Sequence, residues 1–165
     1  MNFKNGSLII SLVTVFSLTA FSQTFSQSTA PVCLSHGTEL QMNNDTVLAW
    51  KNTSKNQYRD RAHVQGTLTK VFADASGHHH YQVQIGAQST DTIEFIYNEK
   101  FGIVPNASLG AKMEACGDYI TANAPVGHYP ASPDGAIVHW IHKSPNPQAH
   151  DSGFMIINGI VCGQK

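Results

Sequence analysis

The sequence predicts a mainly β fold: a small OB-like five-stranded barrel with a C-terminal hairpin and a short N-terminal helix. Five short segments between residues 63 and 142 alternate apolar and polar residues, and residues 101–112 leave room for one helical turn between the third and the fourth. This layout matches an OB-like barrel. Asn158-Gly159 lies between two apolar triplets, which is a strong hairpin signal. Another small β-sandwich is the alternative.

The first 22 residues have the pattern of a signal peptide. Lys4 precedes an apolar stretch over residues 8–21, and Ala20-Phe21-Ser22 offers a small-x-small cleavage site. The stretch is short for a membrane span, so we expect none after processing. The protein is therefore expected to be periplasmic or secreted, and a retained N-terminal anchor is the alternative.

Residues 23–61 are predicted to form a flexible arm that contains a short helix, ahead of a barrel domain over residues 62–165. The arm is rich in Gln, Ser, Thr and Asn up to residue 44. Asn44-Asp45 can cap a helix that runs to about Gln57, with Val47, Leu48 and Trp50 on its apolar face.

Alternating apolar residues define each strand of the predicted barrel. The first strand is bent and carries Gly66, and a Gly117-Asp118 turn leads into the fourth strand. The final hairpin covers residues 154–162. The predicted strands are 63–72, 80–85, 92–97, 119–124 and 136–142, and the fifth is expected to close against the first.

Composition narrows the classes of function. Only 13% of the 165 residues are charged, nine are histidines, and the formal net charge is −1. Without a basic excess, general nucleic-acid binding is not favoured. The chain contains no glycine-rich phosphate loop, no Gly-x-Ser-x-Gly elbow, no His-Glu-x-x-His and no Cys-x-x-Cys.

Three cysteines in an exported chain predict one disulfide and one free thiol. We favour Cys33–Cys116, which would attach the arm to the barrel, although Cys162 permits two other pairings.

The segment from His139 to Asp151 contains the strongest signal for chemistry. His139 and His142 follow a β-branched run, and His150-Asp151 comes shortly after. Positions three apart on a strand point to opposite faces, so both can serve one site only if the strand ends near Trp140 and the chain turns. The alternative is one core histidine and one histidine in solvent.

His78-His79-His80 starts the second strand and is the other histidine-rich segment. Alternation puts His78 and His80 on one side, and the start of this strand can meet the end of the fifth. The alternative is a solvated turn. His36, His63 and His128 are isolated, so we assign them ordinary surface or core roles.

Three functions fit these residues. Imidazoles with a carboxylate suit zinc, copper or nickel, with His78, His139, His142, His150 and Asp151 as ligands. The second function is a hydrolase of phosphodiesters with His139 or His142 as general base and Lys143 or Arg61 facing the developing charge. The third is a structural or partner-binding domain that Trp140 and Pro145 brace. The sequence names no partner.

The C-terminal segment resembles a family of small exported bacterial domains of unknown function, whose members end in His-Trp-x-His-x-x-Pro…His-x-x-Gly. The matching residues are His139, Trp140, His142, Pro145, His150 and Gly153, with His78, Tyr81 and Val83 on the second strand. Phe154 stands where the family has Trp. The resemblance implies an OB-like barrel, groups His78, His139, His142 and His150, gives Gly153 a structural role, and implies no activity.

Overall fold

The structure is a computed structural model and describes residues 30–165. The predicted signal peptide lies outside these residues. The elements in chain order are β1 (Leu34–Ser35), β2 (Thr38–Glu39), α1 (Asn44–Thr53), β3 (Arg59–Val71), β4 (His78–Gln84), β5 (Thr92–Asn98), the 3₁₀ helix η1 (Glu99–Phe101), β6 (Lys112–Thr121), β7 (Ala136–His139), β8 (Phe154–Ile157) and β9 (Ile160–Cys162).

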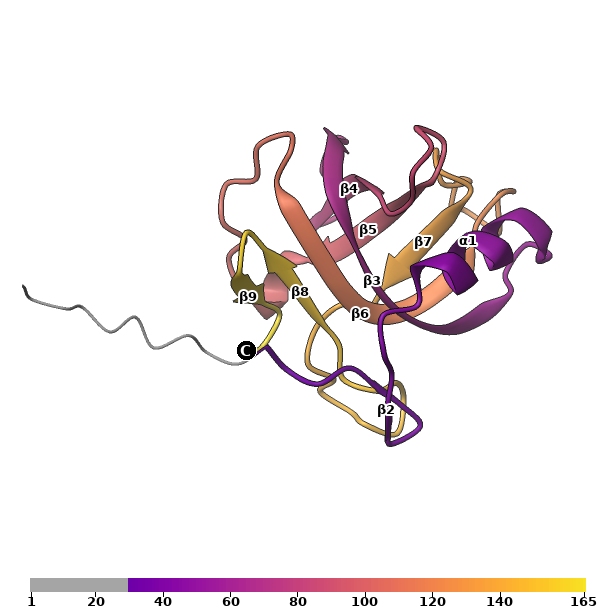
Figure 1. Cartoon of the computed structure of the whole chain (residues 1–165). Coiled ribbons are helices and arrows are strands. Elements are labelled where there is room, and N and C mark those ends of the chain that lie inside the picture. The colour runs from indigo at the N-terminus through magenta and orange to yellow at the C-terminus, as the bar shows by residue number, and fades with distance from the viewer. Residues whose placement is uncertain (1–29) are drawn as a thin grey trace, which may run out of the picture.

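Five strands close into a ring, which confirms the OB-like barrel. Their order is β3-β4-β5-β7-β6, and β6 pairs back to β3 to complete the circle (Figure 1). Strand β7, which corresponds to the predicted fifth strand, lies between β5 and β6 and runs parallel to β5. The expected pairing of the fifth strand with the first is therefore wrong. Strand β3 pairs with β6 from Arg59 to Thr67 and with β4 on its other side, so neither edge of β3 is left for β7.

Alternation along the ring strands fills the barrel interior with apolar side chains. Tyr81 and Val83 of β4, Phe95 of β5, Val138 of β7 and Tyr119 of β6 are all buried. Their neighbours one position along each strand face outward, because successive side chains point to opposite faces of a sheet. The histidines at even positions of β4 and at the end of β7 therefore lie on the outer wall of the barrel.

Helix α1 packs against this barrel and ends earlier than predicted. Val47 is fully buried, and the Trp50 ring lies 5.4 Å from that of Tyr119. The helix stops at Thr53 rather than near Gln57, because the poor helix formers after Lys51 leave its last turn unsupported.

The predicted turn at Gly117-Asp118 is also wrong, because both residues lie within β6. A Cβ at position 117 would come within 2.4 Å of the main-chain oxygen of His139 on the neighbouring β7. Glycine is required here by the close approach of two strands and not by a turn.

The hairpin and the disulfide both match the sequence predictions. Strands β8 and β9 extend the sheet beyond the ring, and the turn between them has positive φ at Asn158 (48°) and Gly159 (83°). A Cys33–Cys116 disulfide attaches the N-terminal segment to β6, and Cys162 is a buried free thiol. Within residues 30–165, no helix is long and apolar enough to cross a membrane.

Candidate functional site

The candidate site begins where β7 ends, on the outer wall of the barrel. Val138 is fully buried, so His139 faces outward. Trp140 follows with φ of 51°, a left-handed conformation that is rare for a bulky residue. The strand therefore ends at His139, Ile141 returns to the core, and His142 leaves the strand direction. This is the turn that the His139–His142 spacing requires for a shared site.

Four imidazoles from two distant segments gather around Trp140, and we refer to His78, His139, His142 and His150 as the histidine cluster. The ring centroids of His78 and His139 are 5.9 Å apart, and those of His142 and His150 are 5.3 Å apart. The indole of Trp140 connects the two pairs, at 4.5 Å from His139 and 5.7 Å from His150. Strand β4, the predicted second strand, and the loop after β7, the predicted fifth, therefore contribute to one site.

Main-chain carbonyls fix the tautomer of three members of the cluster. The Nδ1 atom lies 3.1 Å from the Ser76 oxygen in His78, 2.8 Å from the Lys143 oxygen in His142, and 2.9 Å from the Asp151 oxygen in His150. A carbonyl only accepts, so each Nδ1 donates its hydrogen. When the ring is neutral, Nε2 then carries the lone pair. All three rings are held in the same tautomer.

Burial favours the uncharged form of two members of the cluster, His139 and His142. It lowers the pKa of His139 to about 4, and the positive charge of the other histidines lowers it further in the same direction. Burial also lowers the pKa of His142, although the Lys143 carbonyl opposes this effect. Neither ring nitrogen of His139 has a hydrogen-bond partner among residues 30–165. Neutral imidazole is the form that binds metal ions.

The rings do not converge on a single point. Among residues 30–165, no three His, Cys, Asp or Glu side chains lie close enough together to hold a metal ion. The cluster is therefore two neighbouring imidazole pairs linked by Trp140, and not a preformed three-ligand centre.

The remaining predicted site residues have other surroundings. The Asp151 carboxylate accepts from the backbone N–H of His36 at 2.8 Å, while its carbonyl is the group that orients His150. Lys143 and Pro145 are exposed. Arg61, one of the candidates for charge stabilisation, is buried and committed to Asp118 at 2.6 Å and to main-chain oxygens.

Gly153 lies in close contact with two main-chain oxygens. A Cβ at this position would lie 2.3 Å from the Cys116 oxygen and 2.5 Å from the Trp140 oxygen. The loop over residues 140–153 can therefore press against β6 only with glycine here. Figure 1 shows this loop beside β2, below the end of β7.

Sequence reasoning missed one support of the cluster and one contact of the neighbouring His80. Phe101 of η1 stacks on His142 with ring centroids 3.5 Å apart and planes 5° from parallel. His80 bonds through Nδ1 to the buried carboxylate of Glu94 at 2.7 Å. The spacing of His78 and His80 predicted that both rings lie on one face of the strand, but it did not predict that Glu94 of β5 lies beside His80.

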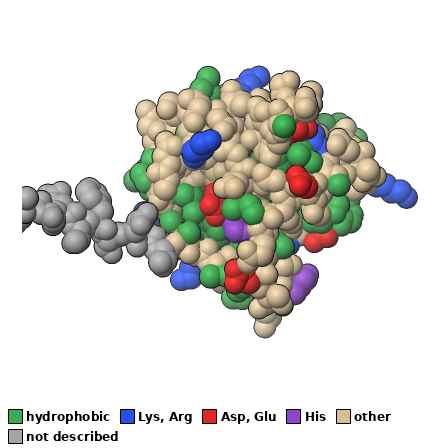
Figure 2. Space-filling view, in the orientation of Figure 1, with side chains coloured by type: hydrophobic (Ala, Val, Ile, Leu, Met, Phe, Trp, Pro, Cys, Tyr) green, Lys and Arg blue, Asp and Glu red, His purple; other side chains and the backbone are tan. Residues whose placement is uncertain are grey.

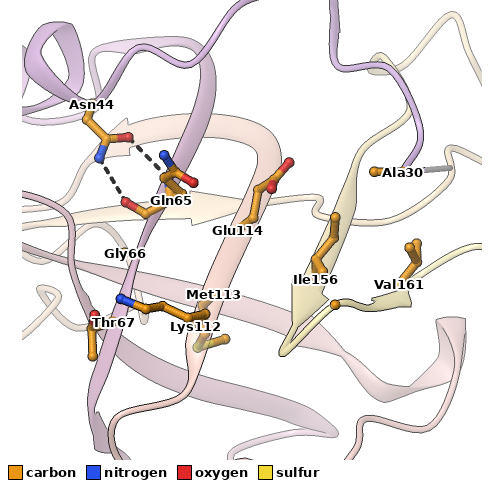
Figure 3. Close-up of a pocket in the computed structure, with 11 residues that line it drawn as sticks. Ala30, Asn44, Gln65, Gly66, Thr67, Lys112, Met113, Glu114, Ile156 and Val161 are labelled. Atoms are coloured by element: carbon orange, nitrogen blue, oxygen red, sulfur yellow. Dashed lines mark hydrogen bonds between the residues drawn. The ribbon is translucent and has the colours of Figure 1, made fainter. Parts of the chain in front are cut away.

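One hollow in the surface borders the histidine cluster, and another lies on a different part of the barrel. One, a cleft of about 510 Å³, is lined by His150, Asp151, Arg59 and the β1–β2 turn. The other, a groove of about 730 Å³, lies over β3, β6 and the β8–β9 hairpin. In that groove the side-chain amide of Asn44 is bonded to the backbone of Gln65, and Lys112 and Glu114 extend in different directions (Figure 3). Only the cleft adjoins the histidine cluster.

The visible surface carries no extended patch of one charge. Basic and acidic side chains are scattered singly over the face shown in Figure 2. This distribution offers no basic track for a nucleic-acid backbone on that face.

No family model, no curated protein and no solved structure matches this chain. The resemblance to the family of exported domains stays a prediction. Any statement about function must therefore come from the site itself.

Proposed function

We propose that the histidine cluster binds a divalent transition-metal ion: zinc, copper or nickel. The shared tautomer carries this proposal. His78, His142 and His150 each donate Nδ1–H to a main-chain carbonyl, which leaves the lone pair on Nε2. Among residues 30–165, Nε2 of His78 and of His142 has no hydrogen-bond partner, while Nε2 of His150 lies 3.5 Å from the Ser144 hydroxyl, which a metal ion would have to displace. In protein metal sites the ligating histidine is oriented in this way by its other nitrogen.

Ring spacing supports the same interpretation. Two imidazoles bound through nitrogen to one tetrahedral ion at about 2.0–2.1 Å have centroids roughly 5 Å apart. The His142–His150 distance is 5.3 Å and the His78–His139 distance is 5.9 Å. Binding would require the two pairs to move closer together. The loop over residues 140–153, which contributes His142 and His150, is the part that would adjust.

Ligand chemistry limits the choice of metal. Neutral imidazoles suit zinc, copper and nickel, whereas calcium and magnesium prefer oxygen ligands. The free thiol of Cys162 is buried and its Sγ lies 3.7 Å from the Ile160 carbonyl oxygen.

The experiment is equilibrium titration of the chelator-treated full chain with Zn²⁺, Cu²⁺ and Ni²⁺, followed by elemental analysis after dialysis. We expect one ion per chain. His142→Ala should weaken binding about 100-fold, since even a supporting residue of a metal site contributes about 10- to 100-fold. His128→Ala is the matched control, because His128 is exposed on another loop.

Two results would reject the proposal: no ion retained by the parent protein, or equal affinity in the parent and His142→Ala. The third function, in which the motif braces the barrel, makes a different prediction. In that case His139→Ala unfolds the metal-free protein, while His142→Ala leaves metal retention unchanged.

A further inference from the structure

The cleft beside His150 is formed by three segments that are distant in the chain. The β1–β2 turn contributes His36, the start of β3 contributes Arg59, and the loop over residues 145–151 contributes Gln148 and His150. Its volume of about 510 Å³ is within the range for small-molecule sites, about 300–1,000 Å³.

Several hydrogen-bond donors in this cleft have no partner. In the described part of the chain, the Arg59 guanidinium forms no ion pair and no hydrogen bond. The ring of His36 and the side-chain amide of Gln148 likewise have no hydrogen-bond partner within residues 30–165. Arg59 instead lies over the Trp140 indole, 5.6 Å from its centroid. This contact holds the guanidinium beside the cleft.

Three carboxylates also line the cleft, and each accepts a hydrogen bond from another group of the protein. Asp60 accepts from the backbone N–H of Arg61 at 2.7 Å, Asp118 accepts from the Arg61 guanidinium at 2.6 Å, and Asp151 accepts from the backbone N–H of His36 at 2.8 Å. None of these carboxylates pairs with Arg59. Within residues 30–165 the cleft thus presents a guanidinium, an imidazole and an amide without hydrogen-bond partners, and a ligand with acceptor oxygens is complementary to these donors.

From this arrangement we propose that the cleft binds a small molecule through an oxyanion group, carboxylate or phosphate, with Arg59 as the principal contact. A guanidinium matches either group with two parallel hydrogen bonds. The amide of Gln148 and the ring of His36 supply further donors from the opposite walls. The cleft shares His150 with the proposed metal site, but anion binding at Arg59 does not depend on a bound metal.

Nuclear magnetic resonance on the ¹⁵N-labelled full chain tests this proposal, with chelator present and ionic strength held constant with chloride. The probes are inorganic phosphate and acetate, which separate the two oxyanion sources. We expect saturable shifts of the Arg59 Nε and Trp140 indole signals with at least one probe. Backbone signals of residues 147–151 should move with the same dissociation constant.

Arg59→Gln should weaken binding about tenfold or more, as measured by the 147–151 signals, because charge-assisted hydrogen bonds are lost. Arg59→Lys keeps the charge without the planar fork, so its affinity should lie between those of Arg59→Gln and the parent protein. Lys55→Gln removes an exposed charge elsewhere and should bind like the parent. Linear, non-saturating shifts with both probes, or equal affinity in Arg59→Gln and the parent, would overturn the proposal.

Discussion

The half-buried imidazole of His139 should make the metal-free protein less stable in mild acid. Its pKa is about 4 in the folded protein, against 6.5 for a free histidine. Between these values the unfolded chain binds more protons than the folded one, so the free energy of unfolding falls as the pH is lowered. The full effect, reached below pH 4, is about 3 kcal/mol, and the part between pH 7 and pH 5 is about 2 kcal/mol.

Urea unfolding of chelator-treated protein at pH 7, 6 and 5, followed by circular dichroism, measures this loss. His139→Gln removes the titrating group, so its stability should fall by about 2 kcal/mol less than that of the parent over the same interval. His128→Gln is the control and should follow the parent, because its ring is exposed. If His139→Gln loses as much stability as the parent between pH 7 and pH 5, burial of His139 is not the cause.

Three further substitutions test how the site is supported, each by urea unfolding at pH 7. Gly153→Ala forces a methyl group against main-chain atoms of β6 and of the 140–153 loop, so it should cost about 3 kcal/mol; an unchanged midpoint would contradict this packing. Changing Cys33 and Cys116 together to Ser opens a crosslink between residues 83 apart, and should cost about 4–5 kcal/mol. The same loss should follow reduction of the parent, and equal stability with and without reductant would disprove it. Arg61→Met leaves a carboxylate and two main-chain oxygens without their donor and should cost about 3 kcal/mol, whereas Lys112→Met, at an exposed position, should have little effect; equal losses in the two variants would refute the buried role of Arg61.

Local patterns were sufficient for β4, β5 and the last hairpin, but they missed the first seven residues of β6, where Gly117 serves tertiary contact. Alternation located β4 and β5 to within two residues, and Asn158-Gly159 located the last hairpin. Gly117 was misread as a turn residue because a glycine that admits a neighbouring strand has the same sequence signature as one that allows a positive φ. Only the position of β7 beside β6 distinguishes the two roles.

The candidate site divides in the same way. The spacing of His139 and His142 indicated that a shared site needs a turn near Trp140, but only the structure shows that the chain turns there. The choice of Cys33–Cys116 over the two other cysteine pairings likewise depends on the structure. The stacking of Phe101 on His142 and the bond of His80 to Glu94 could not be predicted from the sequence. Phe101 and Glu94 come from segments whose position relative to β7 and the following loop depends on closure of the barrel.

By itself the sequence determined the strand order along the chain, the hairpin and the residues with chemical potential, because periodicity and turn preference act between near neighbours. Tertiary structure alone decided that His78 lies beside His139 and that Arg61 pairs with Asp118. It also decided that Arg59 lies over Trp140 and has no acidic partner among residues 30–165. These outcomes depend on which strands become adjacent when the barrel closes, and that adjacency is a property of the whole chain.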